Sequence, residues 1–277
     1  MRMIDKNEVS SIYLKLLVEF DKLCQEHDLR YTLYAGTMLG AIRHKGFIPW
    51  DDDLDVAMPR EDYEKLIALI PSLEHERYHP ICHRTHRGLM SKICYFADTQ
   101  SQVSVSYEKK VQPHSHIHID IYPFDYLPNN VEQYEKIIKK QLRRIWLFKL
   151  CDICVDYPRS SKMKTVIAKT AKFVSSALDI HKVLDAIDTH ARAYSLDTTV
   201  DHSDDLVYTL VTEDPKKPFP ARFLEEYMTV EFENLQVKCL AHYHEILTAL
   251  YGDYMQLPPE DKRKPGGNPY RSFFVEE

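Results

Sequence analysis

The sequence of 277 residues has few glycines and no long apolar run. Seven glycines, no low-complexity tract and no internal repeat argue against modules joined by linkers or a solenoid. No uninterrupted apolar stretch approaches the roughly eighteen residues that suggest a membrane-spanning helix. The first residues, MRMIDKNEVS, lack the apolar segment of a secretion signal. We therefore expect a compact cytoplasmic protein.

The composition is that of an ordinary globular chain, with 44% apolar and 28% charged residues. Its six cysteines mostly lie within apolar patterns, which is typical of free, buried thiols in a reducing compartment. The net charge of −6 is unevenly distributed, because residues 136–172 carry eleven Lys or Arg against two Asp. The remaining chain is strongly acidic, which argues against a nucleic-acid polymer as substrate.

Residues 31–58 contain the most informative pattern. Residues 31–35 read as a strand, Gly36-Thr37 interrupts it, and residues 38–44 read as a short helix. Gly36 has no Cβ and lets a ligand approach the backbone, and Thr37 is placed to cap the helix. The free amide groups at such a helix start predict a phosphate site.

An acidic segment follows this helix. We expect a strand to begin at Asp52. The side chains of Asp53 and Asp55 then project from the same face of this strand, while Leu54 and Val56 enter the core. Two neighbouring carboxylates repel each other unless a cation lies between them, and Mg²⁺ suits such oxygen ligands. An acidic turn in solvent is the alternative for the aspartates alone. The upstream glycine site favours phosphoryl transfer instead.

Residues 114–125 form a second strand pattern with a period of two. Its polar face carries alternating side chains: His114, His116, His118, Asp120 and Tyr122. If this strand lies beside the acidic one, Asp120 supplies a third carboxylate. That carboxylate can bind a metal or accept the proton of an attacking hydroxyl. The histidines could alternatively bind zinc or only line a polar face.

The other segments read mostly as helices. Apolar spacing predicts helices at 7–28, 59–70, 131–155, 162–178, 181–194 and 240–251, and strands at 89–97, 102–107, 206–212 and 229–237, with 72–88 irregular. We expect one compact unit made of a catalytic core (1–128), a basic helical insertion (129–200) and a C-terminal part with a basic tail (201–277).

Basic residues outside the acidic segment offer further contacts. Lys92 interrupts an apolar strand and could hold a phosphate or lie at an exposed edge. Lys262 and Arg263 could close over a nucleotide phosphate. The basic, aromatic-bearing helix at 131–155, within the basic region 136–172, could lie on the inner surface of a membrane, or simply present a solvated charged face.

Three blocks of the sequence resemble the LicD family, whose relatives include fukutin-type proteins. They are Gly36-Thr37 with Leu39-Gly40, Arg43-His44, Phe47-Ile48-Pro49-Trp50-Asp51-Asp52-Asp53 and Asp55; His118-Ile119-Asp120-Ile121-Tyr122-Pro123; and Tyr251-Gly252-Asp253-Tyr254-Met255 with Leu257-Pro258-Pro259 and Lys262-Arg263. The resemblance implies an α+β fold of the nucleotidyltransferase type, similar to the polymerase beta superfamily, with a mixed sheet, flanking helices and a helical insertion.

The resemblance also implies an activity. Family members move a phosphorylated group, phosphocholine or an alditol phosphate, from a CDP-linked donor such as CDP-choline to a sugar hydroxyl. The acceptor is a cell-surface glycan, such as teichoic acid, capsule or lipopolysaccharide, and can be lipid-linked. On this basis Asp53, Asp55 and Asp120 are the expected catalytic residues and ligands of one or two Mg²⁺ ions, which Mn²⁺ could replace.

The expected substrate contacts come from the same blocks and from Lys92. They are Gly36, Thr37, Arg43, Lys92, Trp50, Tyr122, His118, Lys262 and Arg263. Trp50, Tyr122 or Tyr126 could face the quaternary ammonium of choline. Competing readings are a nucleotidyltransferase that releases pyrophosphate from a nucleoside triphosphate, a metal-dependent glycosyltransferase, and a non-catalytic zinc-binding protein.

Overall fold

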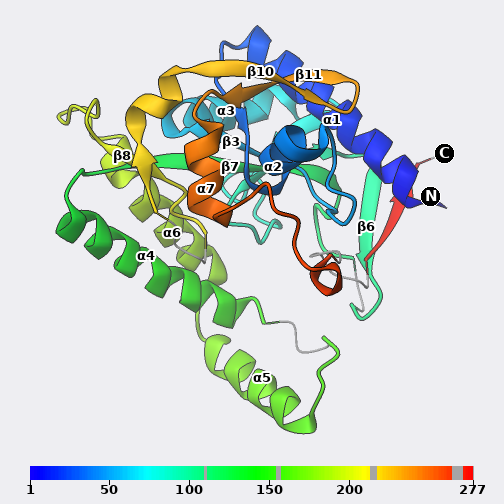
Figure 1. The fold of residues 1–277 in the computed structure, drawn as a ribbon. Helices are drawn as coiled ribbons and strands as arrows, with labels where there is room; N and C mark the ends of the chain where they lie inside the picture. Colours follow the sequence, from blue (N-terminus) through cyan, green and yellow to red (C-terminus); the bar gives the residue numbers. More distant parts are fainter. Residues whose placement is uncertain (109–110, 154–156, 213–216, 264–270, 277) are drawn as a thin grey trace.

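The computed structural model describes residues 1–108, 111–153, 157–212, 217–263 and 271–276. Helices and a central mixed sheet form the core, and helices α4 to α6 lie together at one end of the molecule (Figure 1). The two termini lie near each other, since β1 (Arg2–Met3) pairs with β12 (Arg271–Val275). The expected α+β class is confirmed.

The described helices are seven α-helices and two short 3-10 turns. They are α1 (Lys6–Glu26), α2 (Ala35–His44), α3 (Arg60–Leu73), α4 (Val131–Cys151), α5 (Lys162–Ser175), α6 (Ile180–Ser195), α7 (Tyr243–Tyr251), η1 (Ala221–Glu225) and η2 (Glu260–Lys262). The remaining strands are β2 (Thr32–Leu33), β3 (Asp55–Pro59), β4 (Tyr78–Ile81), β5 (Cys94–Asp98), β6 (Ser101–Val105), β7 (Ile117–Leu127), β8 (Leu206–Tyr208), β9 (Phe219–Pro220), β10 (Tyr227–Phe232) and β11 (Leu235–Leu240).

The central sheet has the order β2-β3-β7-β5-β4 and mixes strand directions. Strand β3 runs parallel to β7, while β2 is antiparallel to β3 and β5 is antiparallel to β7. Strand β7 is the longest, and its far end continues into pairing with β8. This order brings the acidic strand and the second informative strand side by side.

The two faces of β7 have different surroundings. Ile119 and Ile121 are fully buried in the main core, which also includes the apolar sides of α1 and α3. Phe20 of α1, for example, packs against Phe96 of β5 with ring centroids 5.3 Å apart. The opposite face of β7 carries His118 and Asp120, so it remains for the functional site.

Several predicted element boundaries are wrong. The segment expected to be irregular contains β4, and the single strand expected at 229–237 is the hairpin of β10 and β11. Helix α3 continues to Leu73, past Pro71, because a proline removes only one hydrogen bond close to a helix end. The helix expected at 131–155 ends at Cys151 in the structure. Residues 154–156 lie outside the described residues.

The start of α2 also differs from the prediction. This helix begins at Ala35, with Tyr34 as its N-cap, so Gly36 and Thr37 lie inside the first turn. Thr37 therefore does not cap the helix. Ala35 has a positive φ of 45°, a conformation unusual for a residue with a side chain. Strand β2 is correspondingly short, because the chain turns into the helix directly after Leu33.

A buried ionic network joins α6 to the core. Arg60 of α3 is fully buried and donates from Nε to Asp125 Oδ1 of β7 at 2.7 Å. Its Nη1 lies 3.4 Å from Asp188 Oδ1 of α6. A buried guanidinium is stable only when it is paired in this way, so the network fixes how α6 packs on β7 and α3. The division of the chain into three parts stays a prediction.

The five cysteines within the described residues are buried and free, as expected from the sequence. In the same described ranges, no helix is long and apolar enough to cross a membrane.

Candidate active site

The two acidic strands meet in register. Asp55 at the start of β3 is the direct neighbour of Asp120 on β7, and the strands are parallel. Register partners in adjacent strands point to the same face of a sheet, about 4.8 Å apart at the backbone. The structure thus fulfils the condition on which the sequence argument for Asp120 depended.

Helix α2 is attached to this acidic strand by two hydrogen bonds. The backbone N–H of Asp55 donates to Thr37 Oγ1 at 2.8 Å, and the N–H of Tyr34 donates to the carbonyl of Asp55 at 3.0 Å. Both Thr37 and Asp55 are buried. Thr37 therefore positions the carboxylate strand against the first turn of α2.

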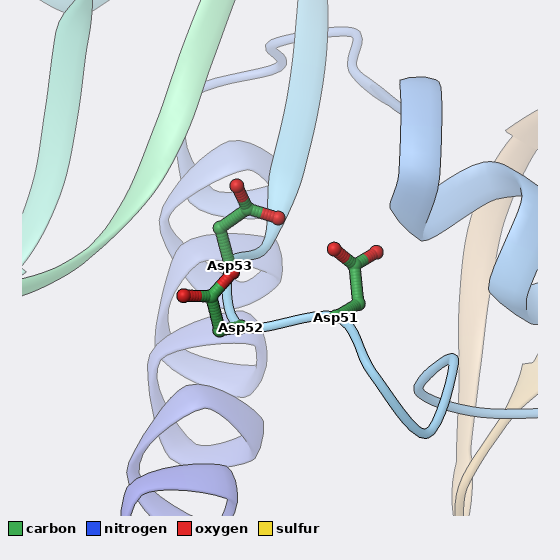
Figure 2. A group of neighbouring side chains, drawn as sticks. All are labelled: Asp51, Asp52 and Asp53. Atoms are coloured by element: carbon green, nitrogen blue, oxygen red, sulfur yellow. The ribbon is translucent and has the colours of Figure 1, made fainter. Parts of the chain in front are cut away.

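Asp53 does not belong to the strand, contrary to the prediction. Strand β3 begins at Asp55, and Asp51, Asp52 and Asp53 form the loop that leads into it (Figure 2). Asp51, Asp52 and Asp53 follow one another along this loop, and the carboxylate of Asp52 lies next to Asp53 (Figure 2). One oxygen from each of the three lies within 4.8 Å of the others. The loop therefore gathers carboxylates that a regular strand would have spread over both faces.

Asp51 and Asp52 are candidate ligands that the sequence reasoning missed. The predicted strand began at Asp52, so it left Asp51 outside and turned Asp52 to the face opposite Asp53 and Asp55. Asp51 lies close to Gly36, since a Cβ added to this glycine would come within 2.6 Å of Asp51 Oδ2. The absence of a side chain at Gly36 thus makes room for a carboxylate of the protein itself beside the first turn of α2.

The electrostatics of this group are unfavourable without a cation. Burial, followed by the charges of Asp51 and Asp120, raises the pKa of Asp53 to about 7. Burial, followed by the charges of Asp53 and Asp120, holds the pKa of Asp55 well above its usual range. The charges that act most strongly on both groups are other carboxylates. Ionised together, these groups would repel each other.

The donor set fits a hard divalent cation. Asp55 Oδ1 is buried and has no hydrogen-bond partner, which is costly for a carboxylate oxygen unless something binds it. Asp120 Oδ1 likewise makes no hydrogen bond of good geometry, although His118 Nε2 lies 3.3 Å away. The five aspartates at this site offer carboxylate oxygens, the ligands that Mg²⁺ and Mn²⁺ prefer.

An aromatic cleft of about 560 Å³ adjoins the carboxylates. Its walls include several aromatic rings: Tyr34, Tyr95, Tyr122, Phe148, Tyr208 and Tyr251. Tyr95 of β5 is the register partner of Asp120, and Tyr122 lies two residues after Asp120 on the same face of β7. Burial, followed by the charges of Asp55 and Asp120, raises the pKa of Tyr122, as expected for a ring close to these carboxylates.

The sequence reasoning found Tyr122 but not the rest of this aromatic cleft. Its other tyrosines come from β5, from β8, from the residue before α2 and from α7, so no local pattern marks them. Tyr126, which was expected as an alternative cage residue, lies elsewhere. Its hydroxyl donates to Glu61 at 3.4 Å, and its ring stacks on His202 with centroids 4.6 Å apart.

A second cleft of about 510 Å³ lies on the other side of Asp51. Gly36, Arg43 and Trp50 line it together with the segment that follows α7. Tyr251 contributes to both clefts. The two clefts therefore adjoin at Tyr251, and Asp51 belongs to the wall of the second one.

Arg43 and Arg263 both have structural contacts at this second cleft. Arg43 Nη1 donates to the carbonyl of Tyr254 at 2.6 Å and holds the segment after α7 against α2. Arg263 Nε donates to the carbonyl of Pro258 at 2.8 Å, with its guanidinium 5.9 Å from the ring of Trp50. Lys262 is the exposed last residue of η2.

Lys92 and the histidines lie differently from the prediction. Lys92 precedes β5 and is not a strand residue; its ammonium lies 5.5 Å from the centre of the Phe148 ring, on the wall of the aromatic cleft. His114 and His116 precede β7, so only His118 shares the polar face of the strand with Asp120. Strand pairing, which starts at Ile117, cannot extend through His114 because its φ is +58°.

His118 is held in a defined orientation. Its ring stacks on Tyr95 with centroids 3.8 Å apart, and its Nδ1 lies 2.6 Å from the carbonyl of His116, which it can contact only as a donor. Its Nε2 thus faces Asp120. Within the described residues, Asp51, Asp52 and Asp53 are the one set of at least three His, Cys, Asp or Glu side chains whose ligand atoms all lie within 4.8 Å of one another. Neither the three histidines nor the pair Asp55 and Asp120 belongs to this compact set, so the structure gives no support to a zinc site on the histidines.

The site combines carboxylates on paired strands, a helix start that contains a glycine, and two neighbouring clefts. These features together define a candidate phosphotransferase site. Residues 28–160 match the sequence model of the family described as LicD/FKTN/FKRP, nucleotidyltransferase domain. Over 274 residues, the chain is 30% identical to the lipopolysaccharide cholinephosphotransferase LicD of Haemophilus influenzae. This match covers 96% of the chain and 97% of the relative.

A shorter match links the chain to an uncharacterised protein of Rickettsia prowazekii. The two are 35% identical over 89 residues, 30% of this chain and 33% of that protein. The family match and the full-length relative agree with the resemblance drawn from the three sequence blocks. The chain belongs to the LicD family.

Proposed function

We propose that this chain transfers phosphocholine from CDP-choline to a sugar hydroxyl of a cell-surface glycan and releases CMP. The relative from H. influenzae is named for phosphocholine transfer to lipopolysaccharide, and it is matched along nearly its whole length. The observation that carries the proposal is the register pairing of Asp55 with Asp120 beside a cleft lined by aromatic rings. An alditol phosphate as the transferred group, and teichoic acid or capsule as acceptor, belong to the same proposal as alternatives.

Asp53, Asp55 and Asp120 would hold one or two Mg²⁺ ions, or Mn²⁺ in their place, and Asp51 and Asp52 are further ligand candidates from the same loop. When bound, such a cation neutralises charge on the diphosphate and on the transferring phosphoryl group. The unpartnered Oδ1 of Asp55 and the mutual repulsion of these carboxylates support this assignment.

Asp120 and His118 are placed to take up the proton of the acceptor hydroxyl. The hydroxyl oxygen attacks the phosphorus that carries choline, the bond from this phosphorus to the CMP oxygen breaks, and the hydroxyl proton moves to Asp120. Because His118 uses Nδ1 to donate to a carbonyl, its Nε2 can share that proton with Asp120 Oδ1, 3.3 Å away. Stacking on Tyr95 keeps the His118 ring in this position.

The aromatic cleft would take the choline group. A quaternary ammonium has no N–H to donate, so it is recognised by the faces of aromatic rings. Tyr95 and Tyr122 adjoin Asp120 along the sheet, which places these rings within reach of a group attached to the transferring phosphorus. The negative field of the aspartates also favours a cation there.

The second cleft would then hold the cytidine end of the donor. The Trp50 ring offers a stacking surface for a base, and the guanidinium of Arg263 lies over that ring. Amide groups of the first turn of α2, beside Gly36, would face the diphosphate. Arg43 contributes through its hydrogen bonds to the Tyr254 segment, and Lys262 would reach a phosphate from η2.

The test is the release of CMP from three donors, CDP-choline, CDP-glycerol and CDP-ribitol, each with candidate glycan acceptors. We expect CMP from CDP-choline in the presence of Mg²⁺ and an acceptor, and no release by an Asp120→Asn variant. Production of pyrophosphate from a nucleoside triphosphate would instead establish a nucleotidyltransferase. CMP release from CDP-glycerol or CDP-ribitol alone would keep the reaction class but overturn the assignment of choline.

A further inference from the structure

Helix α5 buries small side chains and exposes large apolar ones. The residues that it buries are small, namely Ala168 and Ser175. Its large apolar side chains are exposed instead: Phe173 is 80% exposed, Met163 71% and Ile167 60%. An amphipathic helix of a globular protein normally does the opposite, since burial of large apolar groups stabilises the fold.

The exposed apolar residues form one continuous face. The face consists of Met163, Val166, Ile167, Phe173 and Val174. Pairs of these residues are separated by three, four or seven positions, which places them on the same side of an α-helix. At about 100° per residue, Lys162 and Lys169 lie along one edge of this face, and Lys164 lies along the other. We call the surface formed by these five apolar residues and the three flanking lysines the α5 face.

Helix α5 is held so that this face points away from the protein. Lys172 Nζ donates to the carbonyl of Cys151, and Ser175 Oγ donates to the carbonyl of Leu150 at 2.9 Å. Both partners belong to the last turn of α4, and α5 stands apart from the central sheet, beyond α4 (Figure 1). The hydrogen-bonded side of the helix is thus fixed, and the large apolar side chains are on another side.

We propose that the α5 face docks the protein on the surface of a membrane that contains anionic lipids. The apolar side chains would enter the boundary between headgroups and acyl chains, and the lysines at the edges would contact lipid phosphates. Helix α5 carries four lysines and no acidic residue. This charge suits an anionic surface, whereas two copies of the face brought together would repel each other.

The proposal goes beyond the transferase activity and narrows the membrane contact expected for residues 136–172 to the exposed face of α5. Helix α4 contributes a basic groove next to its partner helix α6, lined by Lys140, Arg143, Arg144 and His190. Its apolar residues Ile145 and Phe148 are buried against α6, whereas Trp146 is 59% exposed. Helix α4 thus adds basic groups and one exposed aromatic ring, and α5 supplies the larger apolar face.

The experiment is flotation of the full chain with vesicles of phosphatidylcholine alone or mixed with phosphatidylglycerol. We expect binding to the mixed vesicles and a loss of at least about tenfold in an Ile167→Ser/Phe173→Ser variant, because two large apolar groups are removed. A Lys162→Gln/Lys164→Gln/Lys169→Gln variant keeps the apolar face and should lose affinity about fivefold per lysine, on mixed vesicles only. Val18→Ser, on the exposed side of α1, is the matched control and should bind like the parent protein.

Three outcomes would overturn the proposal: a parent protein that does not float with mixed vesicles, an Ile167→Ser/Phe173→Ser variant that floats equally well, or a parent dimer that this variant converts to monomer. The last outcome, seen by sedimentation velocity, would make the face an interface between two copies. CMP release with a soluble acceptor should be the same in all these variants, so failure of the docking proposal is separable from failure of the proposed reaction.

Discussion

The hydroxyl oxygen of Thr37 accepts a hydrogen bond of 2.8 Å from the backbone N–H of Asp55. Both residues are buried, and the bond joins the first turn of α2 to the first residue of the acidic strand. A threonine that was expected to cap a helix thus positions a candidate catalytic carboxylate.

Replacing Thr37 tests this positioning. Thr37→Val keeps the shape of the side chain but leaves the buried N–H of Asp55 without an acceptor, so we expect a loss of about 1–3 kcal/mol in the free energy of unfolding. CMP release should fall as well. Thr37→Ser, which restores the hydroxyl, should recover most of both losses in denaturant unfolding and in the activity assay. A Val variant with parental activity would show that the bond has no part in positioning Asp55.

The carboxylates themselves should be essential for activity and harmful to stability. We expect Asp53→Asn and Asp55→Asn each to lower CMP release by about 10²–10³-fold or more, by analogy with the loss of other groups that stabilise transition-state charge. Each variant should melt at the same or a higher temperature than the parent in metal-free buffer at pH 7.5, because like-charge repulsion is removed. A fully active Asp53→Asn/Asp55→Asn double variant would contradict the proposed site.

The stability gained by these variants should depend on pH. The folded pKa of Asp53 is about 7, above the value near 3.9 of an unfolded aspartate, so the folded state binds the proton more tightly. Ionisation of Asp53 therefore costs no stability below about pH 4; its cost grows as the pH rises from about 4 to 7 and levels off above that. The melting-temperature difference between Asp53→Asn and the parent should grow from pH 4.5 to pH 7.5 in EDTA. Added Mg²⁺ should raise the melting temperature of the parent and reduce the difference.

Replacing Gly36 should affect activity much more than stability. A Cβ at this position would come within 2.6 Å of Asp51 Oδ2, the end of a side chain that can rotate away. Gly36→Ala should therefore change the melting temperature little but displace Asp51 and lower CMP release by roughly tenfold or more. Gly40→Ala is the contrasting control, because its Cβ would meet the backbone carbonyl of Gly46 at 2.5 Å and should destabilise the fold. Parental activity in Gly36→Ala would exclude Asp51 from the site.

The aromatic cleft predicts a selective loss of affinity for choline. Tyr122→Leu removes a ring face, and we expect the KM for CDP-choline to rise roughly tenfold, within the range of cation–π energies. The KM for any CDP-alditol that the protein accepts should change much less. Tyr122→Phe keeps the ring and should behave like the parent in both assays. An equal rise for choline and alditol donors in Tyr122→Leu would argue against a choline site in this cleft.

The sequence by itself determined most of the helices and the strand carrying Asp120, while the α+β class was implied by the resemblance to the LicD family. These elements follow from apolar periodicity, which depends only on local geometry and is strong in long segments such as α1 and β7. Strands β10 and β11, by contrast, were merged into one, because the connection between them is a two-residue turn, Glu233-Asn234, without a glycine.

Only the tertiary structure decided how the acidic residues are arranged. Alternation placed Asp53 and Asp55 on one strand face, but the chain enters β3 only at Asp55, where pairing with β2 and β7 begins. The loop before it is free to gather Asp51 and Asp52 around Asp53, since no ladder of hydrogen bonds holds these residues extended.

The same distinction holds for the aromatic cleft and the α5 face. Tyr95, Tyr122 and Tyr251 lie far apart in sequence and meet because strand order and the packing of α7 bring them together. The spacing of apolar residues in α5 was visible in the sequence, but which side of that helix is buried depends on its contacts with α4. Local patterns specify the helices and strands, whereas long-range packing specifies which of their faces meet. Both the candidate active site and the docking surface depend on this long-range packing.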